Sequence, residues 1–336
     1  MVYYVRHTHS HGGHDDHDED EELVCSSGND YNGEMLGARI SSIFVILAAS
    51  AIGCYFPLIA KRYKFLKIPD WFFFVTRFIG SGVIIGTGFV HLLVESRHAL
   101  TNPCLGEFSE YAWTEAIALM GIFVMFLIHI FGRKKLENIY GHSSISMEQS
   151  STESNEKGEE HIVQNVEEES KTDYLRIMNV SLLELGIVLH SIFVGLTLAV
   201  TGSEFKTLYI AIVFHQFLEG VGLGSRFAMY RWPPKKTYLP WVLSLVFTLS
   251  TPISTSIGLG LRNTYPPGSR TALYITGVFD AFCAGIMIYS SLVDLISHDF
   301  FYSDEFDYKN KFKKVLFGYG LLAIGVLITA YIGKYA

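Results

Sequence analysis

The chain has 336 residues, of which 49% are hydrophobic and only 18% are charged. Its mean hydropathy is +0.28, and the apolar residues gather into long blocks, which excludes an ordinary soluble globular protein. The net charge of -7 comes mostly from an acidic N-terminal tail and an acidic central segment, so it gives no indication of a nucleic-acid partner.

Residues 1–37 are polar and carry no pattern typical of a cleavable signal peptide. We expect this tail to lie outside the cytosol and to be largely unstructured, because it has no apolar residue to bury between Arg6 and Leu23. It combines a run of acids with five histidines, which are metal ligands held in no fixed geometry. We read them as a loose collector of metal ions, with a merely solubilising tail as the alternative. These histidines are His7, His9, His11, His14 and His17.

Eight apolar blocks follow, each long enough to cross a bilayer, since a membrane-spanning helix needs about 20 predominantly apolar residues. The sequence therefore predicts an all-α membrane protein with the lipid bilayer as its surroundings. Spans 1–3 occupy residues 38–132 and spans 4–8 occupy residues 178–334, separated by a variable loop at 133–177. The blocks cover about residues 39–60, 72–95, 111–132, 178–201, 207–229, 239–261, 272–296 and 315–333.

The basic residues predict the orientation of the spans, because lysine and arginine favour cytosolic loops. One set of alternate loops holds 18 of the 26 basic residues, whereas the other set and both termini hold 7, with Arg77 inside a span. Both termini are therefore expected outside the cytosol. The 133–177 loop is expected in the cytosol, largely unstructured and exposed to cytosolic regulators.

Two of the four cysteines, Cys25 and Cys104, fall in segments predicted to face the oxidising, extracytosolic side. We expect them to form a disulfide. Two free loop thiols are the alternative.

Polar residues inside the spans are the main indication of function, because an ionisable side chain there is costly and usually functional. In the fifth span His215 and Glu219 lie four residues apart and hence on one helical face. His190 lies near the middle of the preceding span, so the three side chains are expected at similar depth. Imidazole and carboxylate ligands suit zinc and related ions. Ser191 and Gln216 stand beside the histidines as further ligands or as groups that orient them.

Other polar residues allow two interpretations each. His91 and Glu95 in the second span look like a gating station for the ion or an interfacial cap. Asp294, near the inner end of the seventh span, is a candidate for the cytosolic exit. His129 is read equally well as a functional group or as a hydrogen-bond partner between helices, and so is Glu184. For the combination of His190, His215 and Glu219, hydrogen bonding between helices is the weaker alternative.

These motifs resemble the ZIP family of zinc and iron transporters, specifically its fungal zinc-uptake branch. The stretches that carry the resemblance are the fourth-span run His190 to Leu196 and the fifth-span run His215 to Gly220. Further similar stretches lie in spans two, six and seven, at Thr87 to Leu92, Thr251 to Ser254, Ala284 to Tyr289 and Leu292 to Leu295.

The resemblance implies zinc uptake into the cytosol across the plasma membrane by alternating access, with iron, manganese and cadmium as further candidate ions. It also implies an eight-helix bundle that frequently forms a homodimer, no enzymatic activity and no resident cofactor. Many relatives place acids where this chain has Val194 and Gln216, so a second bridged metal ion is not expected. The rival interpretations are an intramembrane zinc-dependent hydrolase and a metal sensor that does not transport.

Overall fold

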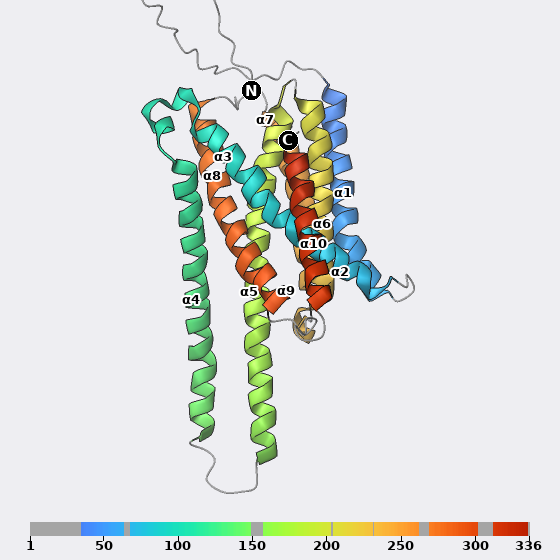
Figure 1. Cartoon of the computed structure of the whole chain (residues 1–336), viewed down its shortest axis with the longest axis vertical. Coiled ribbons are helices and arrows are strands. Elements are labelled where there is room, and N and C mark those ends of the chain that lie inside the picture. The colour runs from blue at the N-terminus through green and yellow to red at the C-terminus, as the bar shows by residue number, and fades with distance from the viewer. Residues whose placement is uncertain are drawn as a thin grey trace, which may run out of the picture.

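The computed structural model describes residues 35–63, 68–148, 157–202, 204–230, 232–261, 269–301 and 312–334. Eight segments within these ranges are long and apolar enough to cross a membrane, which confirms the predicted number of spans. Figure 1 shows that α1 begins and α10 ends at the same end of the bundle. The α-helices are α1 Leu36–Arg62, α2 Asp70–Gly86, α3 Leu93–Leu100, α4 Trp113–Glu148, α5 Lys157–Val200, α6 Phe205–Met229, α7 Leu239–Leu261, α8 Arg270–Tyr289, α9 Ser297–Phe301 and α10 Phe312–Gly333.

Two spans contain a π-helical turn. In the second span Thr87–Leu92 (η2) joins α2 to α3, and in the seventh span Ser290–Ile296 (η5) joins α8 to α9. Such turns are rare and frequently occur at functional sites, because they change the direction of the side chains that follow. Short 3-10 turns at Pro103–Glu110 and Pro234–Lys236 complete two of the loops.

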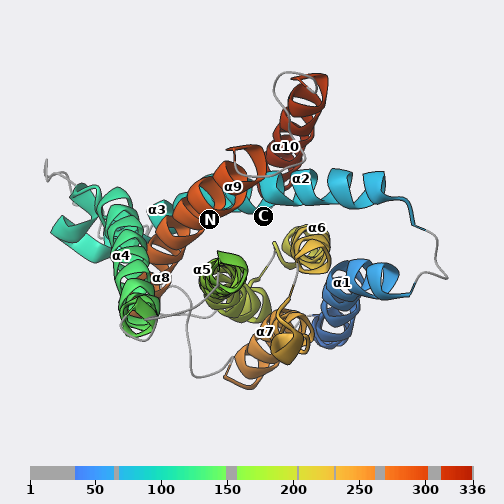
Figure 2. The same cartoon turned by 90° about the horizontal axis from the view of Figure 1, so that it is seen from below.

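The helices pack as two groups, as the view in Figure 2 shows. In the first, α1 packs on α6 and α7, and α5 packs on α7. In the second, α10 packs on α2, and α8 packs on α4 and α3. We call these the α6 group and the α2 group. They meet where α6 crosses α2 and where α5 crosses α8, so any site between α2, α5, α6 and α8 lies at their junction.

The central segment differs from its predicted loop. Helix α4 continues to Glu148 and α5 already begins at Lys157, so both project beyond the rest of the bundle (Figure 1). Residues 149–156 lie outside the described part. The segment is polar and therefore resembles a loop in composition, but its glutamate, lysine and glutamine are good helix formers. Each extension also continues an existing helix and so avoids the cost of nucleation.

Arg39 fixes the corner where α5 ends and α6 begins. Its side chain is 1% exposed, and it donates hydrogen bonds to the carbonyl oxygens of Ala199 at 2.9 Å and Thr201 at 2.5 Å. The guanidinium also lies 4.4 Å from the centre of the Phe205 ring. The last carbonyls of a helix lack partners within it, so Arg39 ties α1 to the two helices that carry the predicted site.

Cys104 takes part in a disulfide, whereas Cys54 and Cys283 are free and buried. Its predicted partner, Cys25, and the five tail histidines lie outside the described residues, so the Cys25–Cys104 pairing stays a prediction.

Helices α2 and α6 approach each other closely at Gly80 and Gly222. A Cβ atom added to Gly222 would lie 2.7 Å from the Cα of Gly80 and 3.1 Å from its carbonyl carbon. Backbone atoms cannot yield as a side chain does, so we expect Gly222→Ala to lower the free energy of unfolding by about 1–3 kcal/mol. Denaturation in detergent measures this. Gly260→Ala, where nothing lies within 4 Å of the added atom, is the control and should show no loss.

Candidate metal centre

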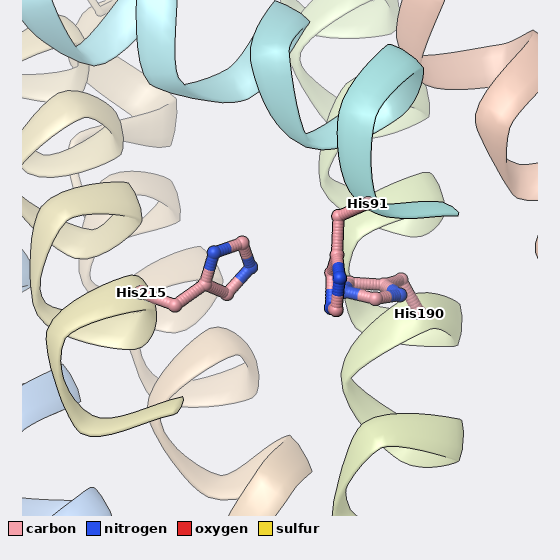
Figure 3. Close-up of side chains that lie close together, drawn as sticks. All are labelled: His91, His190 and His215. Carbon is pink, nitrogen blue, oxygen red and sulfur yellow. The ribbon is translucent and has the colours of Figure 1, made fainter. Parts of the chain in front are cut away.

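Three histidines from three helical segments converge between the two groups. His91 comes from η2, His190 from α5 and His215 from α6, and Figure 3 shows their rings turned toward one another. One ligand nitrogen from each lies within 4.8 Å of the others. The ring of His91 is centred 5.3 Å from the rings of both His190 and His215. All three are buried, with His190 only 1% exposed. This is a preformed cluster of nitrogen ligands inside the bundle.

The structure places His190 and His215 side by side, with 5.9 Å between their ring centres, and brings His91 to them. His91 belongs to the same cluster and not to a separate station above it. The reason is the π-helical turn at Thr87–Leu92, which sets where His91 points. Glu95, four residues further on, remains outside the cluster.

Glu219 offers a carboxylate one turn from His215. Its Oε1 lies 3.2 Å from the Nε2 of His215, and its side chain is fully buried. Within the described part of the chain, both carboxylate oxygens of Glu219 and both ring nitrogens of His190 are buried without a hydrogen-bond partner. Buried polar atoms are nearly always partnered, so such a concentration of unpaired ligand atoms indicates a place for a cation. Three nitrogens and a carboxylate suit zinc, and also ferrous iron.

Gln216 and Ser191 connect helices around the cluster. Ser50 of α1 donates to Oε1 of Gln216 at 3.4 Å, and Nε2 of Gln216 donates to Oγ of Ser191, also at 3.4 Å. Both residues are fully buried. The bonds link α1, α6 and α5 through the chain neighbours of His190 and His215, and a role of Ser191 and Gln216 as ligands or as orienting groups stays a prediction.

Val194 packs in an apolar cluster with Ile46 and Leu198 and is 5% exposed. Its side chain therefore offers no metal ligand. Together with the engaged amide of Gln216, this favours a single metal ion.

A cavity of about 210 Å³ lies beyond Glu95, between α3, α5 and α8. We call it the vestibule. Glu95 and His98 of α3 contribute its ionisable groups, and the rest of its wall is mostly apolar. Its residues lie near the ends of α3 and α5 and the start of α8, at the end of the bundle where α1 begins (Figure 1). Glu95 thus stands between this opening and His91.

Asp294, the predicted exit residue, lies in η5 within a polar cluster in the other half of the bundle. Its Oδ1 accepts a hydrogen bond from Asn179 at 2.9 Å and lies 3.3 Å from Nε2 of His129. His129 also bonds Asn179 at 2.9 Å. This is the interhelical hydrogen bonding that the sequence allowed for His129, here joining α4, α5 and η5.

Two further buried acids lie in the spans: Asp280, to which the sequence pattern gave no role, and Glu184, which was read as a functional group or as a hydrogen-bond partner between helices. Asp280 of α8 faces His190, with 3.9 Å between its Oδ1 and Nδ1 of the imidazole. Glu184 of α5 is 3% exposed, and neither of its oxygens has a hydrogen-bond partner in the described ranges. Neither acid forms an i, i+4 pair with a histidine, so spacing gave no signal for them.

Comparisons with known proteins point to one family. The model of the family described as ZIP Zinc transporter matches residues 36–333, which include all eight spans. The chain is 35% identical to Zinc-regulated transporter 2 of Saccharomyces cerevisiae, over 95% of this chain and 98% of that protein. It is 35% identical to Zinc-regulated transporter 1 of the same yeast, over 93% and 91%. To Zinc transporter 3 of Arabidopsis thaliana it is 36% identical, over 87% and 82%.

Proposed function

Because this chain belongs to the ZIP zinc transporter family, we propose that His91, His190, His215 and Glu219 form the site at which it carries zinc. The protein is a multi-pass membrane protein that takes up zinc into the cytosol, with the plasma membrane as its location. Zinc is the cargo and not a resident cofactor.

The observation that supports this site best is the convergence of three buried imidazoles beside the buried carboxylate of Glu219, whose oxygens have no hydrogen-bond partner among the described residues. A transported ion must shed its water, and these groups replace that water with ligands of suitable chemistry. The carboxylate supplies negative charge where an ion of charge +2 would otherwise be costly in a low-dielectric surrounding.

The position of the site suggests how the ion moves. The α6 group supplies His190, His215 and Glu219, whereas the α2 group supplies His91. A shift of one group against the other would separate His91 from the rest and expose the ion to the other side, which is alternating access. We place both termini and the vestibule outside the cytosol from the distribution of basic residues. Asp294 with Asn179 and His129 is then the inner station from which the ion leaves.

The arrangement argues against the rival functions. A zinc hydrolase needs a metal-bound water and an acid or base beside it. The three imidazoles and Glu219 would supply four ligands and so leave no open position for a reactive water, and the neighbouring Gln216 is held by Ser50 and Ser191. A sensor needs only the metal site. The vestibule on one side of the site and the polar cluster of Asp294 on the other side are needed only if the ion crosses the membrane.

Zinc flux into proteoliposomes distinguishes these functions. We expect the purified protein to carry radioactive zinc inward along a zinc gradient, with saturation. A sensor or a hydrolase binds zinc and gives no flux above empty liposomes, and that result would remove the proposed function. Competition by ferrous iron, manganese and cadmium in the same assay ranks the ions, which His and Glu ligands alone do not separate.

A further inference from the structure

On three helical segments, a residue of the vestibule wall lies about one helical turn from a residue at or beside the histidine cluster. On each segment the two residues lie three or four positions apart, and residues so spaced are neighbours on a helix. The pairs are Glu95 and His91, Phe193 and His190, and Thr276 and Asp280. The vestibule therefore ends on His91, His190 and Asp280.

Of these three residues, Asp280 is the one to which the proposed metal site gives no role. Its side chain is 1% exposed, and its Oδ1 has no hydrogen-bond partner within the described residues. The 3.9 Å to Nδ1 of His190 is too long for a hydrogen bond. A buried carboxylate in a membrane span is costly unless a partner offsets its charge. A cation within reach of both Asp280 and His190 would offset this charge.

Charge also connects Asp280 to the vestibule. Glu95 lies in the vestibule wall, and Asp280 is buried one helical turn beyond Thr276, which lines the same wall. A cation that moves between two carboxyl groups in a protein interior is stabilised by their negative charge. Glu219 lies beside His215 on one side of the cluster, and Asp280 lies beside His190 on the other. An ion of charge +2 among the imidazoles is thus neutralised by two carboxylates.

We propose that Asp280 is an ion-handling residue of the transport cycle: its carboxylate takes zinc from Glu95 in the vestibule and delivers it to His190 and His91. This rests on the proposed function and adds a loading step to it. Since Asp280 belongs to the α2 group and His190 to the α6 group, the ion is handed across the junction between them. Asp280 acts through its charge, so an amide at the same position does not replace it.

The test is zinc uptake by Asp280→Asn, Asp280→Ala and Asp280→Glu, with surface expression measured for each. We expect KM for zinc to rise by about 10–100-fold in the Asn and Ala variants, with the maximal rate at saturating zinc within about 3-fold of the parent. The Glu variant keeps the charge and should recover most of the affinity. Because Glu95 and Asp280 act in one step, Glu95→Gln combined with Asp280→Asn should raise KM by less than the product of the two single effects.

Asp70→Asn is the matched control, because that carboxylate is 90% exposed and lies far from the site on α2. An unchanged KM in Asp280→Asn, or an Asn variant as active as the parent while Ala is impaired, would overturn the proposal. So would a lower maximal rate with an unchanged KM, which indicates a purely structural role. If the parent protein itself carries no zinc, the proposed function is wrong. That result differs from a parent that carries zinc and an Asp280 variant with an unchanged KM, which contradicts only the role of Asp280.

Discussion

Glu219→Gln should reduce zinc uptake at limiting zinc by at least about 100-fold while the protein still reaches the membrane. The amide preserves the volume of the side chain but removes the charge that lies 3.2 Å from His215. Loss of a group that merely orients a ligand costs about 10–100-fold in metal affinity, so loss of a direct ligand should cost at least as much. His190→Ala and His215→Ala should behave alike, because each deletes one of the three nitrogens. Uptake of radioactive zinc into cells, normalised to surface expression, measures the effect.

Glu204→Gln is the control for this series, because Glu204 is an exposed acid just before α6 and far from the cluster. It should transport like the parent. Binding by the purified variants separates the site from the rest of the cycle: Glu219→Gln should bind zinc more weakly in equilibrium dialysis. If a variant lacking His190, His215 and Glu219 together kept normal uptake, these residues would not form the transport site.

The sequence was sufficient for the spans and for the pair His215 and Glu219, for physical reasons. A span is a local property of about 20 apolar residues, and an i, i+4 pair lies on one face in any helix. The antiparallel order of α5 and α6 across a short connection then placed His190 at the same depth. All of this depends on residues close together in the chain.

What the sequence did not predict depends on residues far apart in the chain. The position of His91 follows from the π-helical turn at Thr87–Leu92, which no spacing rule indicates. Asp280 faces His190 only because α8 packs on α5. Gln216 bonds Ser50 only because α1 packs on α6. The helical extensions at residues 137–148 and 157–173 were missed for another reason: their polar composition is shared by loops and by solvent-exposed helices.

Arg226→Met should destabilise the protein by about 3–5 kcal/mol, because it leaves buried charge behind at the other end of α6. Arg226 is 1% exposed and Asp299 of α9 is 4% exposed. Nη2 of Arg226 donates to Oδ2 of Asp299 at 2.9 Å and to Oγ of Ser81 at 2.6 Å. The cluster therefore joins α6 to α2 and α9, across the two groups of helices. Denaturation of the purified protein in detergent measures the loss.

Lys61→Met is the control, because it removes an ion pair that is exposed and not buried. Lys61 and Asp70 also form an ion pair, at 3.2 Å, but their side chains are 43% and 90% exposed, so its loss should cost less than about 1 kcal/mol. The double variant Arg226→Met with Asp299→Leu should regain at least half of what Arg226→Met loses, because it removes the stranded carboxylate as well. An equal cost for Arg226→Met and Lys61→Met would show that the buried pair is not what holds α6 against α2 and α9. A double variant less stable than Arg226→Met would show that Asp299 stabilises the junction through other partners, among which Arg77 lies 3.9 Å away.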